Sequence, residues 1–227
     1  MLGLFRRSKA IKKSSEGQLA SVLQAAAIDL VVDVGANVGQ TRDKLRMAGF
    51  KGRIVSIEPG PEAHAVLLRR QHEDRDWVIA PRVAVGAQTC ETMLHVSEAS
   101  DMSSILRPAD KLLEALPRSE TIKSVQTEVR TLDDLFAEYV PVGARTFLKI
   151  DTQGYERQVL QGGPKALQVI CGIQLELSLF PLYEGEETYL SFLNDLHAWG
   201  FSPHMIIQTT FSRKLNRQLQ IDAIFMR

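Results

Sequence analysis

Short apolar segments that end in an acid or a glycine alternate with amphipathic segments along most of this chain. VVDVG (31–35), IVSIEPG (54–60) and FLKID (147–151) have the length of buried strands, and apolar residues at helical spacing follow each of them. Such alternation is typical of a parallel sheet, because a parallel connection needs a crossover that covers one face. The pattern predicts an α/β fold with a mostly parallel sheet and helices on both faces.

The domain boundaries follow from the same pattern. The chain has 227 residues, 44% of them hydrophobic, which is enough for one well-buried core. We expect a basic, flexible arm over residues 1–14 and a single domain over residues 15–227. Residues 97–127 are polar with weak periodicity, and we expect them to form loops and short helices that cover the cleft. The alternating segments 81–86 and 92–98 are typical of further strands.

The last two apolar segments, residues 202–211 and 219–227, are separated only by the polar stretch SRKLNRQ. This close spacing predicts a hairpin. An antiparallel pair therefore closes an otherwise parallel sheet.

Charge and cysteine content exclude several classes of partner. Lys and Arg number 27, as do Asp and Glu, so no overall field attracts nucleic acid or anionic lipid. Cys90 and Cys171 have neither zinc-site nor disulfide spacing, so a reducing cytosol is the default compartment. The basic start lacks the apolar run of a signal peptide, and no later stretch could span a bilayer. We expect a cytoplasmic protein without nucleic-acid or metal partners.

The turn GANVGQ (35–40) joins a predicted strand to a predicted helix, which is where parallel sheets bind nucleotides. The dinucleotide pattern needs a second glycine where this chain has Asn37, so a pyrophosphate is disfavoured. Glu58 ends the next strand at the spacing of an acid that binds a ribose diol. By itself Glu58 would be read as a solvated acid, but together with the turn it predicts a site for an adenosine without a pyrophosphate.

Several motifs occur in an order that matches one family. They are VVDVGANVGQT, IEPGPEA, RVAVG, TLDDL, FLKIDTQGYERQVLQGG, QLELSLFPLYEGE and QIDAIFMR. In these motifs, over about residues 28 to 227, the chain resembles the FkbM-type S-adenosylmethionine-dependent methyltransferases. The resemblance implies a class I methyltransferase (Rossmann-like) fold with a seven-stranded sheet and an antiparallel last strand. It also implies methylation of hydroxyl oxygens on sugars, glycans, polyketides or related small molecules.

The same resemblance implies a set of residues that bind S-adenosyl-L-methionine. Those around the methionine part would be Asp33, Gly35, Ala36, Asn37 and Gly39. Glu58 would bind the ribose. The adenine would lie near Pro59, Val83, Ala84 and Val85.

Methyl transfer to an alcohol needs a base near the cofactor, at the carboxyl ends of the strands. Asp151 ends FLKI and begins a glycine-containing turn, so it is the first candidate; capping the next helix or holding the methionine ammonium group are its alternatives. Glu176 ends IQLEL and could share the site or serve as an ion-pair partner. Lys149 should point to the face opposite Ile150 and pair with a nearby acid. Without a histidine or third acid at ligand spacing, we expect no metal.

The remaining candidates are polar side chains on loops and one late strand. His204 is a rival base by residue type, although a lone histidine in a strand is more often structural. Ser103, Ser104 and Tyr183 lie on loops that could cover the cleft, and each offers a hydroxyl to a polar acceptor or to solvent.

Two other functions share parts of this pattern. An NAD-dependent oxidoreductase would use the same turn and ribose acid, but Asn37 and the reversed last strand disfavour it. A non-catalytic cofactor-binding protein would keep the fold, but the intact Glu58 and DTQGYE motif make it the weaker reading. Calorimetry with S-adenosylhomocysteine and NAD separates the first two, and methyl incorporation tests the third.

Overall fold

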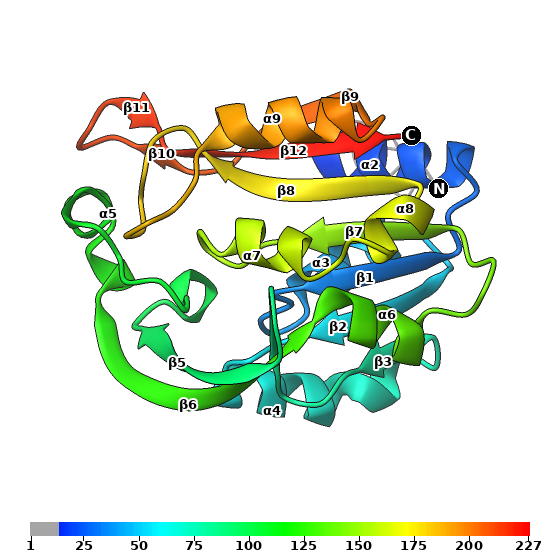
Figure 1. Ribbon diagram of the computed structural model, residues 1–227, viewed down its shortest axis with the longest axis horizontal. Coiled ribbons are helices and arrows are strands. Elements are labelled where there is room, and N and C mark those ends of the chain that lie inside the picture. Colours follow the sequence, from blue (N-terminus) through cyan, green and yellow to red (C-terminus); the bar gives the residue numbers. More distant parts are fainter. Residues whose placement is uncertain (1–13) are drawn as a thin grey trace, which may run out of the picture.

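The computed structural model describes residues 14–227 (Figure 1). The predicted arm over residues 1–14 lies outside this range except for Ser14. The side chain of Ser14 accepts a hydrogen bond of 3.2 Å from the backbone N–H of Gly17 and so caps α2 (Ser15–Ala25). No helix in residues 14–227 has the length and apolar character needed to cross a membrane.

A seven-stranded sheet forms the centre of the described part of the chain (Figure 1). Its first five strands run parallel, and β12 runs antiparallel to both of its neighbours, as the hairpin pattern predicts. The order across the sheet is β3 (Trp77–Ile79), β2 (Arg53–Ile57), β1 (Leu30–Val34), β7 (Thr146–Ile150), β8 (Gly172–Ser178), β12 (Gln220–Met226) and β9 (Ser202–Gln208).

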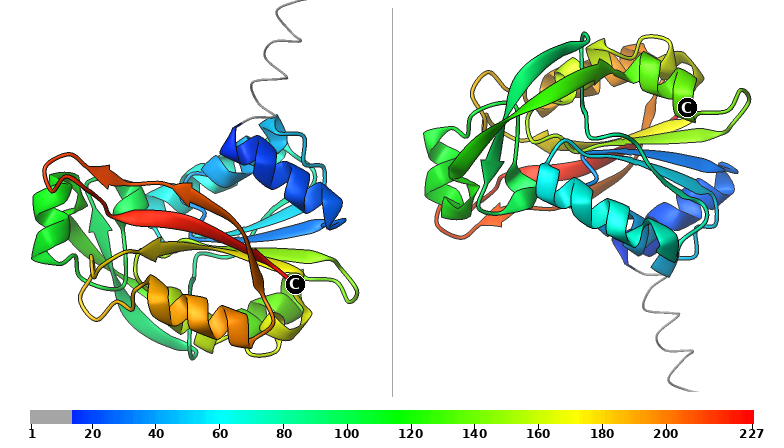
Figure 2. Two further views of the ribbon diagram at one scale, coloured as in Figure 1. Left: turned by 90° about the horizontal axis from the view of Figure 1, so that it is seen from above. Right: turned by 90° about the horizontal axis from the view of Figure 1, so that it is seen from below.

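Helices cover both faces of this sheet (Figure 2). One face carries α2, α3 (Gln40–Met47) and α4 (Pro61–Arg70). The other carries α6 (Leu132–Tyr139), α7 (Glu156–Gln161), α8 (Ala166–Val169) and α9 (Tyr189–Ala198). Alternate residues of each strand enter the two cores: Val31 packs on the α2 side and Val32 on the α6 side.

A second sheet, of three strands, curves around one end of the molecule (Figure 1). It consists of β4 (Ala84–Gly86), β6 (Thr121–Thr131) and β5 (Cys90–Ser97). The alternating segments 81–86 and 92–98 therefore do contain strands, which belong to this second sheet. Strand alternation identifies strands, but it does not identify their partners when the pairing is distant in sequence.

The segment 97–127, predicted as loops and short helices, follows that description only as far as residue 120. It contains the single-turn helices η2 (Ser100–Met102) and η3 (Pro117–Ser119) and the helix α5 (Asp110–Ala115). From Thr121 onward the chain forms β6, which pairs with β5 in antiparallel register. A two-stranded ribbon, β10 (Phe211–Ser212) and β11 (Arg217–Gln218), precedes β12.

The backbones at the ends of β1 and β7 are in contact at the glycine turn that follows β1. The Asp151 N–H donates to the Val34 carbonyl at 3.0 Å, and a Cβ atom at Gly35 would lie 1.8 Å from the Asp151 carbonyl oxygen. Gly35 also has φ of +80°, which favours glycine. Position 35 therefore requires glycine, because the backbone at the end of β7 leaves no room for a side chain. The same contact places Asp151 beside the turn.

Candidate functional site

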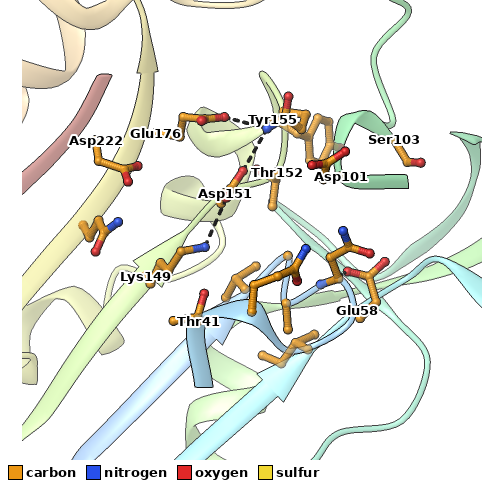
Figure 3. Close-up of a pocket in the computed structure, with 18 of the residues that line it drawn as sticks. Thr41, Glu58, Asp101, Ser103, Lys149, Asp151, Thr152, Tyr155, Glu176 and Asp222 are labelled. Carbon is orange, nitrogen blue, oxygen red and sulfur yellow. Dashed lines mark hydrogen bonds and ion pairs between the residues drawn. The ribbon is translucent and has the colours of Figure 1, made fainter. Parts of the chain in front are cut away.

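A cavity of about 580 Å³ lies at the carboxyl ends of β1, β2, β7 and β8 (Figure 3). This volume is in the range of small-molecule sites. Its wall includes the turn after β1, the end of β2, the segment 100–105, the turn after β7 and residues 207–210. The position is where parallel sheets bind their ligands, as the sequence predicts.

Glu58 and the glycine turn form one end of the cavity. The Asn37 N–H donates to Glu58 Oε2 and the Gly60 N–H to Oε1, both at 2.7 Å. Asn37 has φ of +45°, a left-handed conformation that asparagine adopts more readily than most residues. Burial raises the pKa of Glu58 to about 7, despite these two hydrogen bonds. Each oxygen accepts one backbone bond and keeps capacity for another donor.

Most of the predicted cofactor residues line the cavity, and two do not. Those in the wall are Gly35, Ala36, Asn37, Glu58, Pro59, Val83, Ala84 and Val85. Asp33 is completely buried behind the wall, where its Oδ1 lies 3.3 Å from Lys149 Nζ. Gly39 faces the ring of Trp77, which a Cβ atom would approach to 2.9 Å. These two residues support the wall instead of facing the cavity.

Lys149 links Asp33 to the cavity. The two residues are register partners on β7 and β1, and Lys149 Nζ also lies 3.2 Å from Asp151 Oδ2. The prediction that Lys149 pairs with a nearby acid is confirmed. Burial alone would lower the pKa of Lys149, but the carboxylates of Asp151, Asp33 and Asp222 outweigh it and raise this pKa. Lys149 is therefore a cation in contact with two carboxyl groups, and burial still raises the pKa of Asp33 above its usual value.

Asp151 and Glu176 enter the cavity from neighbouring strands, with Asp222 beyond them and Glu58 on the opposite side (Figure 3). The two carboxylates share the side-chain amide of Gln153, which lies 2.9 Å from Asp151 Oδ1 and 2.5 Å from Glu176 Oε2. Burial, followed by the charges of Asp151 and Asp222, raises the pKa of Glu176 well above its usual range. Asp151 thus has a cation partner, whereas the raised pKa of Glu176 favours its neutral form.

Asp222 and Gln153 belong to this site and are absent from the sequence prediction. Asp222 lies opposite Glu176 in the β12–β8 register, and burial raises its pKa to about 6. The signal for Asp222 was an acid inside an apolar strand, the same signal that marked Glu176. Within residues 14–227, no group of three or more His, Cys, Asp or Glu side chains is arranged to hold a metal ion.

The polar residues predicted to contact an acceptor have different positions. Ser103 and Ser104 line the cavity, although Ser104 Oγ already donates to the Gln153 carbonyl at 2.7 Å. Tyr183 does not line it, because its ring is buried among Leu112, Leu182 and Leu219. Its hydroxyl lies 2.9 Å from Gln153 Oε1.

His204 is exposed on the edge strand β9 and lies outside the cavity wall. It is therefore not placed to act as the base.

Comparison with known proteins gives the family. The model of the methyltransferase FkbM domain matches residues 33–203, which is most of the chain. The chain belongs to the FkbM methyltransferase family. As a member, it is an S-adenosylmethionine-dependent methyltransferase, and the resemblance seen in the sequence motifs is confirmed.

Two similar proteins illustrate what this FkbM methyltransferase is related to. The 2-O-methyltransferase NoeI of Sinorhizobium fredii is 25% identical over 175 residues, covering 74% of this chain and 71% of NoeI. The solved O-methyltransferase of Bacillus cereus, in complex with SAH, is 11% identical with a TM-score of 0.50, covering 99% of this chain and 89% of that one. The second likeness shows the fold, a class I methyltransferase sheet.

The cavity fits the methyl donor of the family. The Glu58 carboxylate has acceptor capacity for two hydroxyls, as a ribose diol requires. Ile57, Val83 and Val85 provide an apolar wall near it. Family membership also disfavours the NAD-dependent oxidoreductase alternative.

Proposed function

We propose that this protein transfers the methyl group of S-adenosylmethionine to a hydroxyl oxygen of a sugar, glycan, polyketide or related small molecule. The observation that carries the proposal is the position of Asp151. Its carboxylate lies in the cavity beside the glycine turn, its side chain is 30% exposed, and Lys149 contacts one of its oxygens. A carboxylate at this place can accept the proton of an alcohol.

The cofactor residues act from one end of the cavity. Glu58, which lines the cavity, would accept hydrogen bonds from the ribose hydroxyls, and the backbone of residues 35–37 would border the methionine part. The adenine would lie near Pro59 and residues 83–85, which also line the cavity. Asp33 and Gly39 act indirectly, through Lys149 and through packing on Trp77.

Asp151 carries the chemical step. When bound, S-adenosylmethionine supplies an electrophilic methyl group on its sulfonium. Asp151 would take the proton of the acceptor hydroxyl when that oxygen accepts the methyl group. Lys149 contacts Asp151 Oδ2 at 3.2 Å and so helps to orient the carboxylate. Alignment of the hydroxyl supplies much of the rate, because it replaces a bimolecular encounter.

The acceptor occupies the other end of the cavity, over β8 and β12. The side chains of Gln174, Glu176 and Asp222 and residues 207–210 form its wall there. Amide and carboxyl groups donate and accept hydrogen bonds, which suits an acceptor with several hydroxyls. Ser103 and Ser104 also line the cavity, from the segment that precedes α5.

The relationship to NoeI supports the choice of oxygen as the acceptor atom, since that protein is named a 2-O-methyltransferase. The test is to incubate the protein with S-adenosylmethionine labelled with ¹³C in the methyl group and a panel of free sugars, oligosaccharides and hydroxylated lactones. A ¹³C signal of an O-methyl group in one acceptor is the expected result, and Asp151→Asn is the control. Methylation of nitrogen would contradict the proposal. Tight binding of S-adenosylhomocysteine without any methylation would favour a non-catalytic protein.

A further inference from the structure

Gln153 has an unusual backbone and a buried side chain for a residue in a turn. Its φ is +56°, a conformation that non-glycine residues rarely adopt, and it is only 8% exposed. Ser104 Oγ donates to its carbonyl at 2.7 Å, which holds this conformation. Backbone strain of this kind is found most often at functional sites.

The side-chain amide of Gln153 has its two ends in different surroundings. Nε2 lies within hydrogen-bond distance of Asp151 and Glu176, and Oε1 lies 2.9 Å from the Tyr183 hydroxyl. An ionised Asp151 can only accept, so the NH₂ end of the amide must face it. Each of the two amide hydrogens therefore goes to a different carboxyl group, on neighbouring strands.

The contacts of Asp151 show what this arrangement achieves. Gln153 holds Oδ1 at 2.9 Å, and Lys149 holds Oδ2 at 3.2 Å. One donor on each oxygen prevents rotation of the carboxylate, and a free lone pair on each oxygen remains for the cavity. The amide has no titratable proton, so its donor is present at every pH at which the enzyme works.

We propose that Gln153 is a positioning residue that orients the Asp151 carboxylate toward the acceptor hydroxyl, with Glu176 and Tyr183 as its own anchors. This inference rests on the proposed function, in which Asp151 is the base. Gln153 acts through its hydrogen bond to Asp151. Its effect on the rate comes from the alignment of Asp151, where an error of about 1 Å costs on the order of 10²-fold.

The kinetic test is a double-mutant cycle measured in single turnovers with the acceptor found in the panel. Gln153→Met keeps the side-chain length and removes both donors. We expect it to slow methyl transfer about 10- to 100-fold and to leave the affinity for S-adenosylhomocysteine unchanged. In an Asp151→Asn background the same change should cost nothing further, because its effect passes through Asp151. Losses that multiply, or a Gln153→Met enzyme as fast as the wild type, would overturn the proposal.

Gln220 offers a matched control. Its Nε2 donates to Glu176 Oε2 at 2.9 Å and has no contact with Asp151, so Gln220→Met should retain a rate near that of the wild type. An equal loss in Gln220→Met would mean that the effect comes from Glu176. If Gln153→Met does not fold, Gln153→Glu takes its place in the cycle, because it keeps the length but has at most one proton to share between two carboxyl groups.

A spectroscopic test needs no acceptor. In ¹⁵N-glutamine-labelled protein saturated with S-adenosylhomocysteine, the two side-chain amide protons of Gln153 should respond separately. Asp151→Asn should move one resonance and Glu176→Gln the other. If neither resonance moves, the amide bridge does not exist. If the wild type methylates no acceptor, the proposed function fails, and these spectra alone decide the bridge.

Discussion

Glu58 gives the sharpest prediction about the cofactor. Replacing Glu58 by alanine removes an acceptor that the two backbone bonds from Asn37 and Gly60 hold in a fixed orientation. Hydrogen bonds to a charged group contribute about 1.5 to 3 kcal/mol. We therefore expect Glu58→Ala to weaken S-adenosylhomocysteine binding by roughly 10- to 150-fold.

The pH dependence of binding follows from the same residue. Burial raises the pKa of Glu58 to about 7, so the free protein holds this proton at pH 6 and has released it at pH 8. The ribose diol needs the ionised carboxylate, whose population rises about tenfold between these two values. Affinity should therefore rise about tenfold from pH 6 to pH 8 and level off above the pKa. In Glu58→Ala this dependence should be absent.

Isothermal titration calorimetry measures both quantities. Titrations of S-adenosylhomocysteine in two buffers of different ionisation enthalpy should show release of a proton near pH 6.5 in the wild type and none in Glu58→Ala. Circular dichroism establishes that the variant is folded. If the folded variant bound with wild-type affinity, or if both proteins had the same pH dependence, Glu58 would not bind the ribose.

Three further predictions concern the centre of the site. Asp151→Asn should lower the single-turnover rate on the order of 10²- to 10⁴-fold and leave the affinity for S-adenosylhomocysteine unchanged. Weakened binding would instead assign Asp151 to the methionine ammonium group. Gly35→Val should abolish binding and lower the melting temperature, because its Cβ would collide with the Asp151 carbonyl oxygen; normal binding by calorimetry would contradict this. Lys149→Met should reduce the free energy of unfolding in urea by about 3 to 5 kcal/mol, because it leaves the buried Asp33 without its cation. A loss below about 1 kcal/mol would show that Asp33 is neutral in the native state.

The central sheet could be predicted from local pattern because its signals are local. Apolar runs that end in Asp33-Val34-Gly35, Glu58 or Asp151 mark strand ends, and the short spacing before β12 marks a hairpin. The second sheet could not be predicted in the same way. Strand β6 pairs with β4, and with part of β5, across more than thirty residues of chain. Alternation carries no information about which partner a strand selects.

The sequence predicted those site residues whose side-chain direction follows from their position in a strand. Glu58 and Asp151 follow the ends of parallel strands, so their place at one edge could be inferred before the structure. The alternation of strand faces also placed Lys149 opposite Ile150, but it did not reveal that Asp33 shares its face and is thereby kept from the cavity.

The contact between Gln153 and Tyr183 depends on loop geometry, which the sequence pattern does not give. A positive φ at a non-glycine residue and a hydroxyl buried against an amide have no signature in sequence periodicity. Asp222 depended on the register of β12 against β8, which pairs it with Glu176. These residues became visible only once distant segments were in contact.

A crystal structure of the protein with S-adenosylhomocysteine tests the proposed site most directly. We expect the ribose hydroxyls to donate to the Glu58 carboxylate and the thioether sulfur to lie on the Asp151 side of the cavity. A ribose bound away from Glu58, or a sulfur turned away from Asp151, would contradict it.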